Sequence, residues 1–215
     1  MGYKYVVFDL DGTILDSHEG ICKCFQKALK AYGVEESIEN ITKLLGPPLS
    51  KTIITKYGFS KEDGAAAMKI HMKRLKEKGI YECLIYDGIV EMLQKLKENG
   101  VKMSIATNKP EEASILQLKH FDLYKYFEIV VGNNWTQDRG TKGEFIKMTL
   151  EHMGVTDKSE VIMVGDRFND LAGGVENGLD TLGVTYGYGS EEEIVGCNPT
   201  HIAKSPSEIA DIVLA

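Results

Sequence analysis

The chain has 215 residues, of which 43% are hydrophobic and 27% charged, and its formal net charge is −7. This length and composition are typical of a soluble globular protein with one substantial core, or with a core and an insertion. The acidic balance excludes a general nucleic-acid-binding surface, and the apolar run near the N-terminus is too short for a signal peptide or a membrane span. The four cysteines have no zinc spacing, so we expect reduced thiols in a cytoplasmic protein.

The first half of the chain is predicted to contain one strand and then helices. An apolar, β-branched run predicts a buried strand over residues 3–10. From about Ser17 to Cys83 the patterning is almost only helical, and the first helix is predicted to end at Gly33. A break at residues 43–48 precedes two further predicted helices, over Ser50–Tyr57 and Lys61–Lys78.

After Asp87-Gly88 the predicted elements alternate between helix and strand. Helices are predicted over Ile89–Asn99, Glu111–His120, Lys142–Met153, Asp170–Asn177 and Ser207–Leu214, and strands over Val101–Ala106, Phe127–Val131, Glu160–Val164, Thr181–Thr185 and His201–Ala203. This alternation predicts an α/β fold with a Rossmann-like parallel sheet flanked by helices. The helical stretch after the first strand is then an inserted all-helical domain. We expect a discontinuous core of residues 1–16 and 84–215 and an insertion of residues 17–83.

Two carboxylates, Asp9 and Asp11, follow the first strand directly. Aspartate is depleted in strands, and a buried carboxylate is costly unless it is paired or binds a metal. Ligands of open α/β sheets bind at the carboxyl ends of the strands, so the pair indicates a reaction site. An ordinary Asp-Gly turn at Gly12 is the alternative. A calcium loop is excluded, because Ile14 occupies its sixth position, which requires glycine.

Polar residues also follow two later strands. Thr107 and Asn108 stand where a strand enters a helix, which suits either phosphate binding or ordinary helix capping. Asp166 follows another strand and Asp170 comes one helical turn later, which suits either a metal site or a helix cap. If these strands are neighbours, Asp9, Asp11, Asp166 and Asp170 converge. Crowded carboxylates of this kind fit Mg²⁺, a hard cation with oxygen ligands.

A cationic counter-charge is needed at such a site. Lys142 stands at the start of a predicted helix and is our candidate, with Lys109 and Lys147 as competitors. A solvated surface lysine is the default interpretation for each of them.

The ordered set Asp9-x-Asp11-Gly12-Thr13, Thr107-Asn108, Lys142 and Gly165-Asp166-x-x-x-Asp170 resembles the four motifs of the haloacid dehalogenase-like superfamily. The resemblance spans nearly the whole chain. The helical insertion is similar to the small cap of the phosphoglycolate phosphatase-like branch. Asp11 separates the chain from the dehalogenases, whose pattern lacks it.

The resemblance implies a two-step phosphoryl transfer with Mg²⁺ as cofactor. Asp9 would be the nucleophile that forms an aspartyl-phosphate, and Asp11 the general acid and base. The metal would be held by Asp9, the main-chain carbonyl of Asp11, Asp166 and Asp170. Lys142, Thr107, the Asn108 amide and Gly12 are expected at the transferring phosphate.

The resemblance also implies that the cap selects the substrate. The stiff loop Gly46-Pro47-Pro48 is similar to the cap loop that faces the active site in this branch, although its residues alone fit a linker that breaks a helix. Ser17, Lys43 and Lys51 are further candidates for contacts to the leaving group. The expected hinges are Asp16-Ser17 and Tyr86-Asp87-Gly88, so that cap closure would exclude water.

The expected function is a Mg²⁺-dependent phosphatase of small cytosolic phosphomonoesters, either phosphoglycolate phosphatase-like or 5'-nucleotidase-like. A β-phosphoglucomutase-like phosphomutase is the alternative, followed by a pyrophosphatase or a weakly catalytic ligand-binding protein. The expected partner is a small phosphorylated metabolite, not a nucleic acid polymer or a membrane. A monomer or a small homo-oligomer is expected.

Overall fold

The computed structural model describes residues 2–136 and 138–215; Met1, the first residue of the predicted core, lies outside them. Its centre is a six-stranded sheet in the order β5-β4-β1-β6-β7-β8, in which every pairing is parallel. The strands are β1 (Tyr5–Phe8), β4 (Lys102–Pro110), β5 (Phe127–Asn133), β6 (Val161–Gly165), β7 (Asp180–Val184) and β8 (His201–Ala203). The predicted parallel sheet is confirmed.

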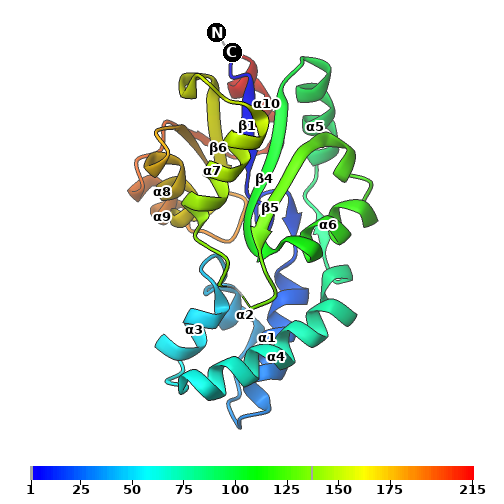
Figure 1. Cartoon of the computed structure of the whole chain (residues 1–215), viewed down its shortest axis with the longest axis vertical. Helices are drawn as coiled ribbons and strands as arrows, with labels where there is room; N and C mark the ends of the chain where they lie inside the picture. Colours follow the sequence, from blue (N-terminus) through cyan, green and yellow to red (C-terminus); the bar gives the residue numbers. More distant parts are fainter. Residues whose placement is uncertain (1, 137) are drawn as a thin grey trace.

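Helices cover both faces of the sheet, so the strands are buried on both sides (Figure 1). On β1, Val6 and Phe8 pack into one hydrophobic cluster and Val7 into the opposite one, as the two-residue period of a strand requires. The first cluster is completed by α5 (Ile89–Glu98) and α10 (Pro206–Leu214), and the second by α7 (Lys142–Met153). The remaining helices of this part are α6 (Glu111–His120), α8 (Phe168–Glu176) and α9 (Glu191–Gly196).

A separate group of helices lies at the end of the molecule opposite the chain termini (Figure 1). It comprises α1 (His18–Lys30), α2 (Ile38–Thr42), α3 (Leu49–Thr55), α4 (Lys61–Glu77) and the 3₁₀ turn η1 (Gly79–Tyr81). These helices share a hydrophobic cluster that contains Phe25, Ile41 and Ile53. The cluster also includes Ala113, which lies in the first turn of α6. The helical group therefore packs directly against the sheet-containing part. The division at residues 17 and 83 stays a prediction.

The two connections to this helical group run side by side. Leu15–Asp16 (β2) and Leu84–Ile85 (β3) form a two-stranded antiparallel ribbon that the sequence patterning does not predict. The ribbon joins the expected hinge segments, because β2 leads directly into Ser17 and β3 is followed by Tyr86. A paired connection of this kind restricts where the chain can bend.

Several element boundaries differ from those predicted. β4 continues through Thr107-Asn108-Lys109 to Pro110, where we expect a turn, because Thr107 pairs with Gly132 and Pro110 with Asn133 of β5 across a register shift. α8 begins at Phe168, earlier than the predicted Asp170. The short elements α2, α9, η2 (Tyr124–Tyr126) and η3 (Lys158–Glu160) were not predicted, because one or two turns carry too little periodicity. Within the described part of the chain, no helix is long and apolar enough to cross a membrane.

Candidate active site

The carboxyl ends of β1, β4 and β6 meet at one edge of the sheet. Phe8, the last residue of β1, is paired with Ile105 of β4 and with Val164 of β6. The backbone amide of Asp9 donates to the carbonyl of Val164 at 2.9 Å, so the β1–β6 pairing reaches the first aspartate. The chain therefore brings the residues that follow these three strands to a common position.

Three of the predicted metal-ligating carboxylates lie together at this edge. Asp9, Asp166 and Asp170 each offer an oxygen, and these oxygens lie within 4.8 Å of one another. All three side chains are buried. Asp170 is oriented from the first turn of α8, where its Oδ2 accepts a hydrogen bond from the amide of Arg167 at 3.0 Å. A buried cluster of carboxylate oxygens is the donor set that a hard divalent cation prefers.

Lys142 supplies a cation to this acidic cluster. Its Nζ lies 2.6 Å from Oδ1 of Asp9 and 3.0 Å from Oδ1 of Asp170, and it also donates to the carbonyl of Ala106 at 2.7 Å. The lysine starts α7, whose N-terminus is fixed by a capping box between Thr141 and Glu144. The capping box therefore fixes the position of the Lys142 backbone, from which the side chain extends to the aspartates.

The pKa values of the cluster reflect its burial and crowding. Burial raises the pKa of Asp9 to about 7, against the opposing effect of Lys142. Burial and the neighbouring Asp170 hold the pKa of Asp166 well above its usual range. Burial lowers the pKa of Lys142, but Asp170 and Asp9 together outweigh it and leave that pKa above its ordinary value. One ammonium does not balance three carboxylates, so the cluster favours a further cation or a proton.

Gly12 permits close packing around Asp166. Its backbone has φ of +90°, and a Cβ built there would lie 2.2 Å from Oδ2 of Asp166. The same carboxylate accepts hydrogen bonds from the amide of Tyr188 at 2.8 Å and from Oγ1 of Thr13 at 3.3 Å. Glycine is therefore required both by the turn and by the carboxylate pressed against it.

Asp11 belongs to a second charged group beside the first. Its Oδ1 lies 2.7 Å from Nζ of Lys109, which is buried, and it also accepts a hydrogen bond from the hydroxyl of Ser17. The backbone amide of Ser17 donates to the hydroxyl of Tyr188 at 2.8 Å. Lys109 and Ser17 thus hold the Asp11 carboxylate in one orientation.

The three candidate lysines have three different environments. Lys142 contacts Asp9, Lys109 contacts Asp11, and Lys147 is exposed on α7, 4.0 Å from Glu151. The structure therefore places Lys142, and not its two competitors, at the first aspartate.

Thr107 and Asn108 reach the site from β4. Thr107 is buried, and its Oγ1 accepts a hydrogen bond from the amide of Lys109 at 3.2 Å. The side-chain amide of Asn108 donates to the carbonyl of Gly46 at 3.0 Å, so it ties β4 to the loop between α2 and α3. The phosphate contact expected of the Asn108 main-chain amide stays a prediction.

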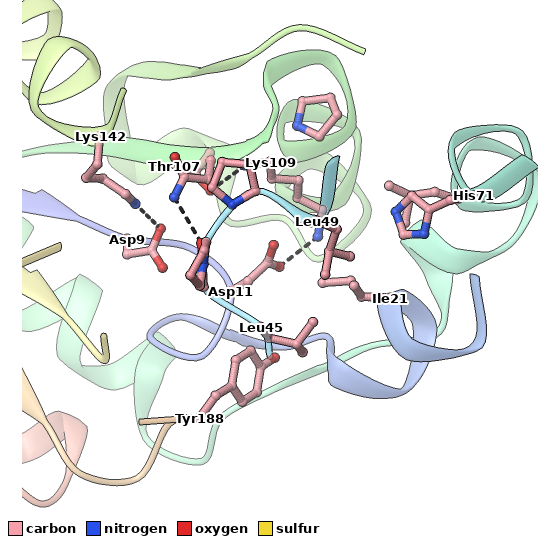
Figure 2. Close-up of a pocket in the computed structure, with 16 residues that line it drawn as sticks. Asp9, Asp11, Ile21, Leu45, Leu49, His71, Thr107, Lys109, Lys142 and Tyr188 are labelled. Carbon is pink, nitrogen blue, oxygen red and sulfur yellow. Dashed lines mark hydrogen bonds and ion pairs between the residues drawn. The ribbon is translucent and has the colours of Figure 1, made fainter. Parts of the chain in front are cut away.

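A cleft lies between the strand ends and the helical group (Figure 2). Its lining includes Asp9, Asp11, Lys142 and Thr107 from the sheet-containing part and the loop Gly46-Pro47-Pro48 from the helical group. Of the weaker candidates, Ser17 contacts Asp11, whereas Lys43 is exposed and pairs with Glu39 at 3.1 Å, and Lys51 is exposed.

Sequence patterning missed two residues of the cleft that carry polar ring atoms or hydroxyls, as well as its apolar lining. His71 of α4 and Tyr188, which follows β7, both line it, although neither lies in one of the four motifs. Sequence patterning presents Lys109 only as an alternative to Lys142. Thr107, Asn108, Lys109 and Pro110 all line the cleft, because β4 extends to Pro110 and carries this segment to the edge of the sheet.

Known proteins resemble this chain over nearly its whole length. Residues 6–184 match the family model described as haloacid dehalogenase-like hydrolase. A 5'-nucleotidase of Pseudomonas aeruginosa is 34% identical over 200 residues, which cover 93% of this chain and 90% of that protein. A phosphoglycolate phosphatase of Vibrio parahaemolyticus is 29% identical, with 98% and 96% covered.

The solved structures agree with these relatives. A protein of Clostridium acetobutylicum, described as a predicted phosphatase, superimposes with a TM-score of 0.94 at 36% identity and covers 100% of this chain and 99% of its own. The predicted family and the α/β fold are thereby confirmed. The chain belongs to the haloacid dehalogenase-like hydrolase family, as a phosphatase that acts on phosphate esters.

Proposed function

We propose that this protein is a Mg²⁺-dependent phosphatase that hydrolyses small cytoplasmic phosphomonoesters through an aspartyl-phosphate on Asp9. The observation that carries the proposal is the position of Asp9, whose Oδ1 is held at 2.6 Å by Lys142 at the head of the cleft. An anionic nucleophile and an anionic phosphate repel each other. The buried ammonium beside Asp9 would offset that repulsion and stabilise the charge of the transferring group.

The residues present fit a Mg²⁺ ion. Asp9, Asp166 and Asp170 provide three buried carboxylate oxygens within 4.8 Å of one another, and we assign the main-chain carbonyl of Asp11 as a further ligand. Burial raises the pKa values of Asp9 and Asp166, and the neighbouring Asp170 raises them further, so a bound cation would stabilise their charged forms. When bound, the ion would neutralise phosphate oxygens and act as a Lewis acid.

The chain's own residues would divide the reaction into two displacements. In the first, a carboxylate oxygen of Asp9 forms the new bond to phosphorus, the ester oxygen leaves, and Asp11 gives that oxygen a proton. In the second, Asp11 takes a proton from water as the water oxygen displaces Asp9 and releases phosphate. Thr107, Gly12 and the Asn108 amide would contact the phosphate throughout, and Lys109 and Ser17 would keep Asp11 oriented.

We also propose that residues 17–83 move as a cap that closes over the cleft. The paired connections β2 and β3 would act as the hinge, and closure would exclude water from the intermediate. The Gly46-Pro47-Pro48 loop, which lines the cleft and is tied to Asn108, would contact the leaving group. The unpaired cysteines support the cytoplasmic location in this proposal.

The test of the catalytic proposal is phosphate release from 4-nitrophenyl phosphate with Mg²⁺ and with EDTA. We expect release only with Mg²⁺ and its loss in Asp9→Asn, while the control Asp211→Asn, which alters an exposed carboxylate paired with Lys95, keeps wild-type activity. Full activity of Asp9→Asn would remove Asp9 as the nucleophile. A panel of phosphoglycolate, nucleoside monophosphates, sugar phosphates and pyrophosphate would follow, and isomerisation of sugar phosphates faster than their hydrolysis would favour the phosphomutase.

The metal site has a test that is independent of turnover. Mg²⁺ that binds only the folded protein raises its melting temperature, with a gain of about 2.7 kcal/mol at a concentration 100 times the Kd. We expect this rise for the wild-type protein and for Asp211→Asn, and not for Asp166→Asn. An equal rise in all three would show that Mg²⁺ binds elsewhere.

A further inference from the structure

The cleft has two chemically different ends. The end at the sheet is lined by Asp9, Asp11, Thr107 and Lys142. The other end is formed by apolar side chains of the helical group together with one histidine, and Figure 2 shows that histidine, His71, across the pocket from Asp9 and Lys142. The apolar residues that line the cleft on the helical group are Ile21, Leu45, Leu49 and Leu75. A phosphate seated at Asp9 would therefore direct its leaving group toward the apolar end.

His71 has an unused hydrogen-bonding atom. Its side chain is only 2% exposed, and its ring packs edge-on against Phe25 with the centroids 6.0 Å apart. Nδ1 has no hydrogen-bond partner among the residues that the structure describes, although the side chain lines the cleft. A buried polar atom without a partner is destabilising, so a ligand atom that met it would be favoured.

The His71 ring is neutral. Burial lowers its pKa to about 3, and the nearby cations Lys109 and Arg74 act in the same direction. His71 therefore cannot supply positive charge to a ligand, but it can donate or accept one hydrogen bond.

The nearby cations are already paired. Among the described residues that line the cleft, the cations are Lys109, which contacts Asp11, and Lys142, which contacts Asp9 and Asp170. Arg74, beside His71 on α4, is held by both carboxylate oxygens of Glu82 at 2.8 and 3.0 Å. A carboxylate or a second phosphate at this end would therefore have to compete with Asp11 or Glu82 for a cation, and burying an anion without a free cation is costly.

We infer that the apolar end of the cleft selects an uncharged leaving group whose polar atom hydrogen-bonds to His71 Nδ1. The body of that group packs against the apolar lining. This inference rests on the proposed phosphatase function and specifies its substrate class. Phosphomonoesters of neutral alcohols, such as nucleosides or phenols, are substrates in preference to phosphorylated hydroxy acids and pyrophosphate.

The test compares two esters that differ in charge and are matched in shape, 4-carbamoylphenyl phosphate and 4-carboxyphenyl phosphate. With Mg²⁺ we expect kcat/KM to be at least about tenfold higher for the carbamoyl ester, because no cation at this end is free to pair with the carboxylate. Equal values, or a preference for the carboxylate, would overturn the inference. This comparison uses the wild-type protein, so its result does not depend on whether a variant folds.

A variant tests the contribution of His71. We expect His71→Phe to lower the ratio of kcat/KM for the carbamoyl ester over unsubstituted phenyl phosphate by about three- to tenfold, because one hydrogen bond is lost. The matched control Lys73→Gln changes an exposed residue of the same helix and leaves the ratio unchanged. An unchanged ratio in folded His71→Phe would show that His71 does not contribute to the choice of leaving group.

Binding separates the two proposals. If the Mg²⁺-loaded protein hydrolyses neither aryl ester, the phosphatase proposal fails for this class of substrate. Calorimetric titration of both esters into the wild-type protein then tests the preference for an uncharged leaving group without requiring hydrolysis. Tighter binding of the carbamoyl ester supports it, whereas equal binding, tighter binding of the carboxylate, or no binding of either ester overturns it.

Discussion

The ammonium of Lys109 lies 2.7 Å from Oδ1 of Asp11, although the two residues are 98 positions apart in the chain. The Lys109 side chain is 3% exposed and that of Asp11 17%, so water screens the pair only weakly. The pair joins the end of β4 to the loop after β1. It therefore orients the residue that we propose as the general acid and base.

Lys109→Met should be costly for both stability and activity. Removal of one partner leaves the Asp11 charge uncompensated, so we expect the free energy of unfolding to fall by about 2–4 kcal/mol. A double-mutant cycle with Asp11→Asn, measured by urea unfolding, should give a coupling energy of about 1–3 kcal/mol. Effects that simply add would mean that the contact contributes nothing to the stability of the folded protein.

Lys142→Met and Lys147→Met should show that two lysines of the same helix differ in their effect on catalysis. Lys142 contacts Asp9 and Asp170, whereas Lys147 is exposed beside Glu151. We expect Lys142→Met to lower kcat on an aryl phosphate by about 10³-fold, since it removes a buried cation from the phosphoryl site. Lys147→Met should keep wild-type kcat. A loss of kcat in Lys147→Met comparable to that in Lys142→Met would contradict the assignment.

Gly12→Ala should be far more damaging than Gly33→Ala. Both glycines have positive φ, +90° and +75°, so both variants carry the cost of a left-handed backbone, about 1 kcal/mol. A Cβ on Gly12 would also lie 2.2 Å from Asp166 Oδ2, whereas one on Gly33 would meet no atom within 4 Å. We expect urea unfolding to show the greater loss for Gly12→Ala, together with loss of the Mg²⁺-induced rise in melting temperature. Equal losses would show that the contact with Asp166 relaxes freely.

His71 should make the protein less stable in mild acid. Its pKa is about 3 in the folded protein, below the value of about 6.5 expected for an unfolded chain. The unfolded state therefore binds the extra proton, and the stability that His71 contributes is fully present above about pH 6.5 and is lost as the pH drops toward 3. Between pH 7 and pH 5 this loss amounts to about 2 kcal/mol.

The measurement is the free energy of unfolding at pH 7 and pH 5 for the wild-type protein and His71→Phe. The variant should lose about 2 kcal/mol less than the wild-type protein over this interval. His152→Phe, which replaces an exposed histidine, serves as the control and should behave like the wild-type protein. The same pH dependence in all three proteins would mean that His71 is not neutral in the fold.

The boundaries of β4 illustrate what sequence patterning cannot supply. Thr107, Asn108 and Pro110 are turn-forming residues, so the pattern predicts that the strand ends at Ala106. In the structure Thr107 is paired with Gly132 and Pro110 with Asn133, because β5 supplies the neighbouring backbone. Tertiary pairing thus overrides local preference at the segment that carries Lys109.

The sequence alone determined the fold class and the residues that carry chemistry at the strand ends. Strand–helix alternation implies a parallel sheet, and the carboxyl ends of its strands share one edge, so Asp9 and Asp166 had to lie near that edge. The contacts of Lys142 with Asp9 and of Lys109 with Asp11, and the place of His71 in the cleft, come from the packing of the folded chain. They join residues far apart in the sequence, and their partners are set by how helices pack on the sheet, which no local pattern encodes.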